Sequence, residues 1–183
     1  QFMWNDGSGN YRNATQGNPA NAPVYEAAAL NGMGALKFAG DDTLDLGPAV
    51  TGVKTIFAVF RQTAGPVQTK IFGGDAITTA ANGNIALQRE GGAGLIDSSV
   101  TTVTYHVVTY EATAGAYALF VDGADKGGNT DPQALGDLTK VGNNAPSIIA
   151  EVVAYDRVLS TLARQKIEGY LAHKWGLDNQ LPV

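Results

Sequence analysis

The sequence predicts an all-β fold, a sandwich of two antiparallel sheets with one α-helix packed on it near the C-terminus. Short runs of apolar or alternating residues, about ten in all, are separated by glycine, asparagine and aspartate turns, as in β-sandwiches. The 23 glycines exceed the roughly 7% of average usage, which fits many tight turns. Only one stretch repeats apolar residues at helical spacing. A chain of 183 residues is most simply a single domain, 1–183.

The first 33 residues form a loop-rich segment of asparagine, glycine, alanine and proline, which are turn-forming residues. The aromatic residues Phe2, Trp4, Tyr11 and Tyr25 are expected to hold this segment against the core. The triplet 13–15 matches the glycosylation motif N-x-[ST], but an ordinary turn is the better interpretation of so short a pattern.

The strands are predicted from residue 34 onward. Residues 53–60, VKTIFAVF, are almost continuously apolar, which is typical of a central strand of a sandwich. The pair Asp122-Gly123 indicates a two-residue hairpin turn, because a type I′ turn needs positive φ at both positions. Further strands are predicted at 35–40, 44–46, 70–72, 84–90, 105–110, 117–121, 139–142 and 148–154.

One amphipathic helix is predicted over residues 160–176. Ser160 can cap the free amides of the first turn, and Gly176 can end the helix in a left-handed conformation. The helical spacing places five residues on the face toward the sandwich: Ala163, Ile167, Tyr170, Leu171 and Trp175. By the same spacing, Arg164, Glu168 and His173 are predicted to point largely away from it.

Composition excludes several classes of protein. The formal net charge is −5, and the lysines and arginines form no stripe, which argues against nucleic-acid binding. The chain has no cysteine, so disulfides and thiolate metal sites are excluded. It also shows no signal peptide and no apolar run of the roughly 18 residues that a membrane helix needs, so no membrane insertion is expected.

Four motifs in order resemble the laminin-G-like (LamG) domains of the concanavalin A-like lectin/glucanase superfamily, in their bacterial and phage form. These motifs are WNDGSGN with ALNGMGALKFAGDD, HVVTYEATAGAYALFVDG, KVGNN with IIAEVVAYDRVLS, and ARQKIEGYLAHKWGL. The resemblance covers nearly the whole chain and implies a concanavalin A-like jelly roll. Members often have a further strand before the W-N-D segment, and it is missing here. We therefore expect an open sheet edge, which is filled by a neighbouring subunit or by an N-terminal segment that is removed before residue 1.

The sequence gives little support for an enzyme. Glycosidases need two carboxylates flanking one bond, and the superfamily's E-x-D-x-E and E-x-D-x-x-E patterns do not occur. Glu151 and Asp156 are predicted to lie on opposite faces of a strand, and Glu111 has no acidic neighbour in sequence. The two histidines, His106 and His173, are better explained as packed or solvated residues than as catalytic or metal-binding groups.

Two kinds of ligand site are considered. Exposed aromatic residues could stack on sugars while asparagine amides bond to their hydroxyl groups. Calcium, which many members of the resembled family hold, would take carboxylates and carbonyls from loops. The calcium candidates are Asp41 and Asp42, and the sugar candidates are Trp4, Tyr11, Asn82, Asn84, Asn143 and Asn144.

Three functions remain open from the sequence. The first is a non-catalytic binding or adhesion module on an extracellular or virion surface that recognises carbohydrate or another surface ligand. The second is a self-assembling structural subunit of a capsid, tail or surface filament. The third, least favoured, is a glycan-active hydrolase or lyase with an atypical site.

Overall fold

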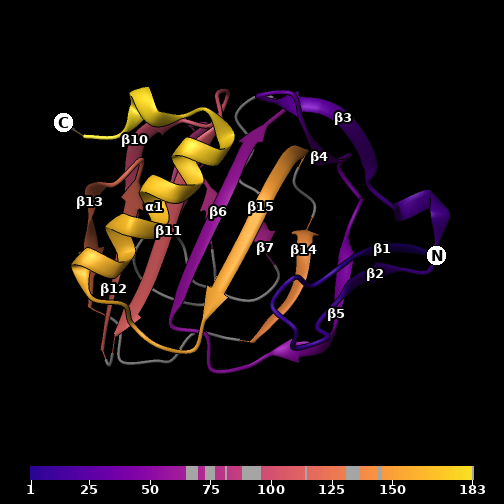
Figure 1. The fold of residues 1–183 in the computed structure, drawn as a ribbon, viewed down its shortest axis with the longest axis horizontal. Helices are drawn as coiled ribbons and strands as arrows, with labels where there is room; N and C mark the ends of the chain where they lie inside the picture. The colour runs from indigo at the N-terminus through magenta and orange to yellow at the C-terminus, as the bar shows by residue number, and fades with distance from the viewer. Residues whose placement is uncertain are drawn as a thin grey trace.

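A computed structural model of the chain confirms the β-sandwich with one C-terminal helix (Figure 1). The structure describes residues 1–64, 70–72, 77–80, 82–87, 96–113, 115–130, 137–143 and 146–182. Within them, two antiparallel sheets of eight and seven strands stack face to face. None of the helices in these ranges is long and apolar enough to cross a membrane.

The eight-stranded sheet has the order β1-β2-β5-β14-β7-β8-β9-β10. Of its strands, β1 and β2 in the N-terminal segment, β8 and β10 were not predicted. The bounds are β1 Phe2–Trp4, β2 Ala14–Gln16, β5 Leu44–Val50, β7 Lys70–Phe72, β8 Ile77–Thr79, β9 Asn84–Leu87, β10 Ile96–Thr101 and β14 Leu138–Asn143.

The seven-stranded sheet has the order β13-β12-β11-β6-β15-β4-β3. Asp122 and Gly123 both have positive φ, 51° and 77°, so the predicted hairpin turn joins β12 to β13. The bounds are β3 Val24–Leu30, β4 Met33–Phe38, β6 Thr55–Gln62, β11 His106–Thr113, β12 Ala116–Val121, β13 Ala124–Asn129 and β15 Ser147–Tyr155.

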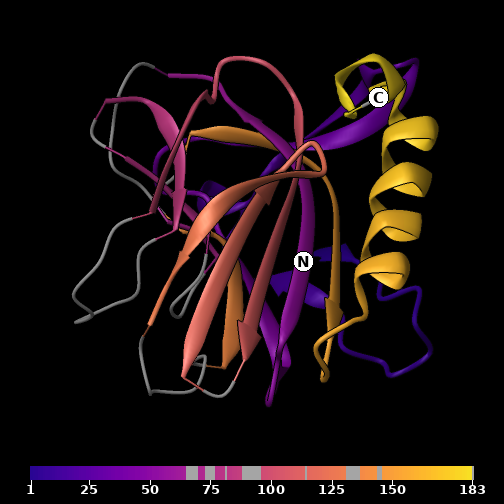
Figure 2. The same ribbon diagram turned by 90° about the vertical axis from the view of Figure 1, so that its left-hand side faces the viewer.

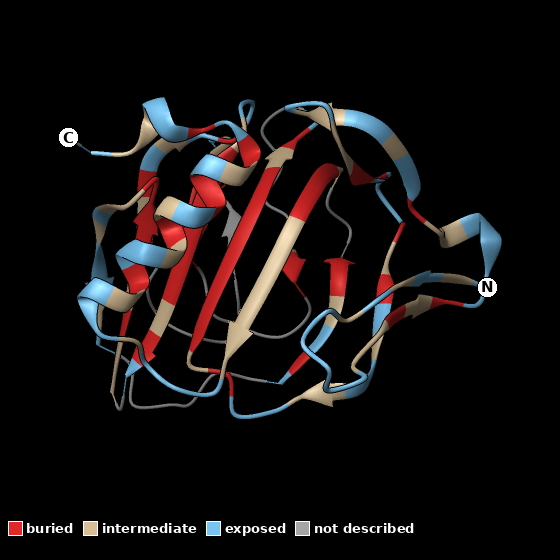
Figure 3. Ribbon diagram, viewed as in Figure 1, coloured by how far each residue is buried: buried red, intermediate tan, exposed pale blue. Residues whose placement is uncertain are grey.

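The main core lies between the two sheets and is lined by alternate residues of their strands. Central strand β6 is buried on both faces, because a helix covers its outer side (Figure 3). Its inward residues Ile56, Ala58 and Phe60 join the main core, while Phe57 and Val59 face the helix. This explains the continuous apolar run in the sequence.

Helix α1, Thr161–Trp175, lies along the outer face of the seven-stranded sheet (Figure 2). The predicted ends are confirmed: Ser160 Oγ accepts the N–H of Ala163, and Gly176 has φ 69°. Trp175 is 4% exposed and donates its Nε1–H to Glu151 Oε2 on β15 at 2.6 Å. The helix therefore closes a second core against the sheet.

The predicted face of α1 is partly wrong. Arg164 and Glu168 point into the sheet and are 6% and 1% exposed, whereas Tyr170 is 60% exposed. Arg164 Nη1 lies 2.8 and 2.9 Å from the two Glu168 carboxylate oxygens, and its guanidinium stacks 3.6 Å over the Phe120 ring. Thr109 Oγ1 donates to Glu168 Oε1 at 2.7 Å. Burial of these two charges is possible because they compensate each other. Charged residues are usually exposed, so the residue types alone predicted the wrong location.

The two sides of the sandwich differ in how their edges are protected. On one side the end strands β10 and β13 lie against each other. The other side ends in β1 and β3, which appear together on the right of Figure 1.

Candidate ligand-binding surfaces

Loop 5–13, which joins β1 to β2, is built around the carboxylate of Asp6. Asp6 Oδ1 accepts the N–H of Ser8 at 2.8 Å, and Oδ2 accepts the N–H of Arg12 at 3.0 Å. The Asp6 N–H donates to Asn13 Oδ1 at 2.8 Å. The Ser8 side chain and the backbone N–H groups of Arg12 and Ser8 hold the pKa of Asp6 below its ordinary value. These bonds fix the loop shape from within.

Tyr11 lies in this loop with its side chain in solvent. It is 84% exposed, and its φ of 57° is in the left-handed region that a bulky residue rarely adopts. The next residue, Arg12, turns back and donates from Nη1 to the Ala49 carbonyl at 2.5 Å. The loop therefore keeps the Tyr11 backbone in a conformation that costs about 1–3 kcal/mol and persists only where the surroundings enforce it.

Trp4 lies in β1 opposite Ala14, is partly buried and packs against the main core. Its ring supports the sandwich, so it is less available to a ligand than Tyr11. Asn13 has its side-chain oxygen engaged by Asp6 and precedes the buried Ala14, which supports the interpretation of the 13–15 triplet as part of a turn.

Asn82 and Asn84 meet on a shared partner, Asp97 of β10. Asn82 Nδ2 donates to Asp97 Oδ2 at 2.6 Å, and Asn84 Nδ2 donates to Asp97 Oδ1 at 2.9 Å. The backbone N–H of Ser99, followed by these two amides, holds the pKa of Asp97 below its ordinary value. The sequence did not single out Asp97. Its distance in sequence from the asparagines, and the bulge in β10, hid the pairing.

The predicted sugar-binding residues do not form one patch. The registers Asn143↔Lys70, Lys70↔Thr78 and Thr78↔Ala86 place the end of β14 and the start of β9 at the same end of the eight-stranded sheet. Two strands separate them, which corresponds to about 14 Å. Loop 5–13 lies at the opposite end, beside Ala49. The Asn143 side chain and the whole of Asn144 lie outside the described part of the chain.

Asp41 and Asp42, the calcium candidates, lie in the turn that precedes β5. Asp42 is 5% exposed and its Oδ2 accepts the N–H of Ala39 at 2.7 Å, so it closes the turn before β5. Calcium takes six to eight oxygen ligands. Among the described residues, no group of three or more acidic, histidine or cysteine side chains gathers around this pair or elsewhere.

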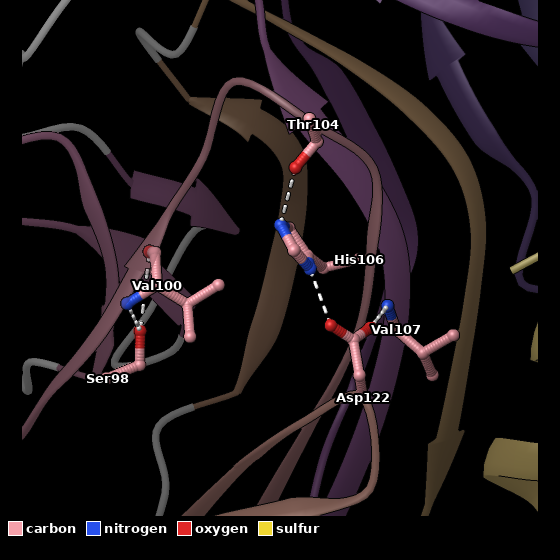
Figure 4. A network of polar contacts seen from close by, with 6 residues as sticks. All are labelled: Ser98, Val100, Thr104, His106, Val107 and Asp122. Carbon is pink, nitrogen blue, oxygen red and sulfur yellow. Dashed lines mark hydrogen bonds and ion pairs between the residues drawn. The ribbon is translucent and has the colours of Figure 1, made fainter. Parts of the chain in front are cut away.

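His106 is buried within a chain of polar contacts (Figure 4). Its Nδ1 lies 2.6 Å from Asp122 Oδ2, and its Nε2 lies 2.8 Å from Thr104 Oγ1. Asp122 Oδ1 also accepts the N–H of Val107 at 2.9 Å. The hydroxyl, imidazole and carboxylate have the connectivity of a nucleophile triad. Here, however, the carboxylate belongs to Asp122, the first residue of the β12–β13 turn. These polar contacts therefore connect the β12–β13 hairpin to the start of β11.

Three glutamates, Glu168, Glu151 and Glu111, lie on helix α1 and on the strands beneath it. Glu168 is paired with Arg164 beneath the helix, and Glu151 accepts from Trp175 Nε1 and lies 2.9 Å from Lys174 Nζ. Burial raises the pKa of Glu111 on β11, with the Arg164 cation opposing the rise and Glu168 adding to it. A raised pKa suits a general acid, but the carboxylate that contributes to the rise is Glu168, which is buried and paired with Arg164.

No model of a known protein family matches the sequence, and no curated protein matches it. Solved structures match the fold at low identity. A sialidase from Trypanosoma rangeli, in complex with the inhibitor DANA, has a TM-score of 0.64 and 14% identity over 87% of this chain. This chain spans only 29% of that sialidase.

Two smaller domains match over most of their own length. Domain 4 of AbnA, an extracellular GH43 arabinanase from Geobacillus stearothermophilus in complex with arabinotriose, has a TM-score of 0.61 and 13% identity. The alignment covers 83% of this chain and 84% of that domain. The CBM40 of the Ruminococcus gnavus IT-sialidase, bound to α2,3 sialyllactose, has a TM-score of 0.57 and 13% identity, covering 74% and 96%. At such identities these matches show a shared β-sandwich fold, and the LamG resemblance stays a prediction.

Proposed function

We propose that this chain is a non-catalytic carbohydrate-binding module of an extracellular or virion surface, and that loop 5–13 is its sugar-contacting surface. The observation that carries the proposal is Tyr11, an aromatic ring 84% exposed at a strained backbone position. A loop whose backbone is already fixed loses less entropy when a sugar stacks on the ring that it carries. The neighbouring Asn5, Ser8 and Asn10 are exposed and could bond to hydroxyl groups.

Two further observations support this function. The structures of similar fold include domains bound to arabinotriose and to sialyllactose. Glu168 is paired with Arg164, and Glu151 accepts from Trp175 Nε1, so these two carboxylates are engaged within the fold and not free for acid–base chemistry.

A glycan array with the wild-type chain and Tyr11→Ala tests the proposal. We expect Tyr11→Ala to weaken binding of the captured glycan about tenfold, which corresponds to about 1.4 kcal/mol. Val103→Ala is the matched control, because Val103 is also apolar and 61% exposed but lies just before β11, away from loop 5–13. Equal affinity of the wild type and Tyr11→Ala would reject loop 5–13 as the site, and the absence of any glycan signal would reject the function.

A further inference from the structure

Strand β3 is the longest edge strand of the sandwich that no other described strand covers. On the opposite side β10 and β13 protect each other, and β1 has only three residues. Edge strands are commonly protected by lysine, proline or a bulge. β3 reads VYEAAAL, without lysine or proline, and its bulge falls between Glu26 and Leu30. The stretch Val24–Glu26, before the bulge, is therefore a regular edge without lysine or proline.

The side chains along this stretch are unusually exposed for their chemistry. Val24 is 64% exposed and Tyr25 is 62% exposed. The Tyr25 ring lies directly over Gly34 of β4, where a Cβ would collide with it. This contact holds the ring in place, while most of its surface still faces solvent.

Two charged side chains beside this edge have no partner among the described residues. The Glu26 carboxylate has one buried oxygen, Oε2, without a hydrogen-bond partner among the described residues. Lys37 on β4 is exposed and forms no ion pair or hydrogen bond within the same part of the chain. Lys37 lies opposite Val24, and Glu26 lies opposite Ala35. Glu26 and Lys37 are therefore on the same face of the sheet, but they are not directly opposite each other.

We propose that two copies of this chain pair through β3, antiparallel about a two-fold axis at Tyr25. Tyr25 then faces the partner's Tyr25, and Glu26 lies opposite the partner's Val24. In each copy Lys37 lies opposite Val24 on the next strand. Glu26 therefore reaches across the partner's Val24 to the partner's Lys37. The Cα atoms of these two residues are two strand spacings apart, about 10 Å. The two-fold axis repeats this contact, so both unpaired carboxylates meet both unpaired ammonium groups.

This charge complementarity selects a second copy as the occupant of the edge. The pairing joins two seven-stranded sheets into one continuous sheet. The bulge after Glu26 restricts it to a few residues, so the interface is small and the association is of the weak class. The pairing does not depend on the proposed function, because loop 5–13 plays no part in it.

Sedimentation velocity from about 10 µM to about 1 mM tests the proposal. The wild type is expected to shift from monomer to dimer over this range. Glu26→Lys and Lys37→Glu each turn two attractive contacts per dimer into repulsive ones, so each is expected to weaken dimerisation about tenfold. Asp156→Lys, whose side chain is 82% exposed at the end of β15, is the matched control and should behave as the wild type.

The decisive measurement mixes the two single variants. A Glu26→Lys chain and a Lys37→Glu chain repel their own kind but complement each other, so the mixture should form a heterodimer at wild-type concentrations. A loss of folding cannot produce this rescue. A wild type that stays monomeric throughout the range, or a mixture that associates no better than its components, would overturn the proposal.

Discussion

At the scale of single residues, Glu111 brings a charge into a half-buried position on the outer face of β11. Its Oε1 is buried and has no hydrogen-bond partner within the described part of the chain. Burial raises its pKa, and the Arg164 cation compensates only in part. Glu111 therefore opposes the stability of the surface on which α1 packs.

The raised pKa predicts a pH-dependent stability. The folded chain holds the Glu111 proton more tightly than the unfolded chain does, so stability falls as pH rises from below the ordinary value of 4.5 through the raised pKa. Glu111→Gln removes this dependence and should unfold at a higher temperature than the wild type at pH 7. Near pH 3 the two should coincide, because Glu111 is then neutral in both folded and unfolded states.

Thermal unfolding followed by circular dichroism at pH 3, 5 and 7 would measure this difference. Asp156→Asn is the control, because this carboxylate is exposed and its removal should leave the midpoint nearly unchanged. A Glu111→Gln midpoint that falls below the wild type at pH 7 would contradict the argument.

At the scale of elements, helix α1 is fastened to the sheet by a buried ion pair as well as by apolar packing. Arg164 and Glu168 are adjacent on the helix, and their contacts reach Phe120 and Thr109 on the sheet. Removing one member of a buried pair leaves the other charge without compensation.

We expect Arg164→Met to lower the free energy of unfolding by about 3–5 kcal/mol, because Glu168 is then buried without its cation. The double variant Arg164→Met/Glu168→Leu should recover most of this loss, since both charges are gone and the volumes are similar. Urea unfolding measures both, with the exposed Arg157→Met as the control. A double variant no more stable than Arg164→Met would show that the uncompensated charge is not the cause.

The ends of α1 were predictable from sequence, but its orientation was not. Ser160 and Gly176 act through local backbone geometry, which a short sequence window contains. Which face of α1 is buried against the sheet depends on which charged side chains are paired there. Glu168 accepts a hydrogen bond from Thr109, which lies 59 positions away in the sequence. Helical spacing of apolar residues therefore placed Tyr170 inside and Arg164 outside, the reverse of the structure.

The strands and the candidate site were also predictable only where local sequence determines them. The long apolar run 53–60 was recognisable, whereas β1, β2, β8 and β10 are short or bulged and lie in glycine- and asparagine-rich sequence. Tyr11 was a candidate from residue type alone. Its exposure depends on the loop that Asp6 holds together, and the distance between Asn84 and loop 5–13 depends on strand order.

At the scale of the whole molecule, binding and pairing use different parts of the chain. Tyr11 projects from loop 5–13, beside the end of β5, while pairing would use β3 of the other sheet. Pairing through β3 uses no residue of loop 5–13, so we expect both copies of this loop to stay free in a dimer. A weak dimer with two sugar sites holds a multivalent surface more strongly than either site alone, because the second contact forms at a high effective concentration.

This combination predicts that retention on a surface depends on β3, although the affinity for one sugar does not. On a densely glycosylated sensor surface, the wild type should dissociate at least about tenfold more slowly than Glu26→Lys. The two should bind the same soluble oligosaccharide equally in calorimetry, because each still presents an unchanged Tyr11. Mixing Glu26→Lys with Lys37→Glu should restore slow dissociation, and adding Tyr11→Ala to both should abolish it.

If the wild type and Glu26→Lys dissociate at the same rate, the dimer contributes nothing to surface binding. If they differ also for the soluble sugar, Glu26 acts on the sugar site itself rather than through the second copy.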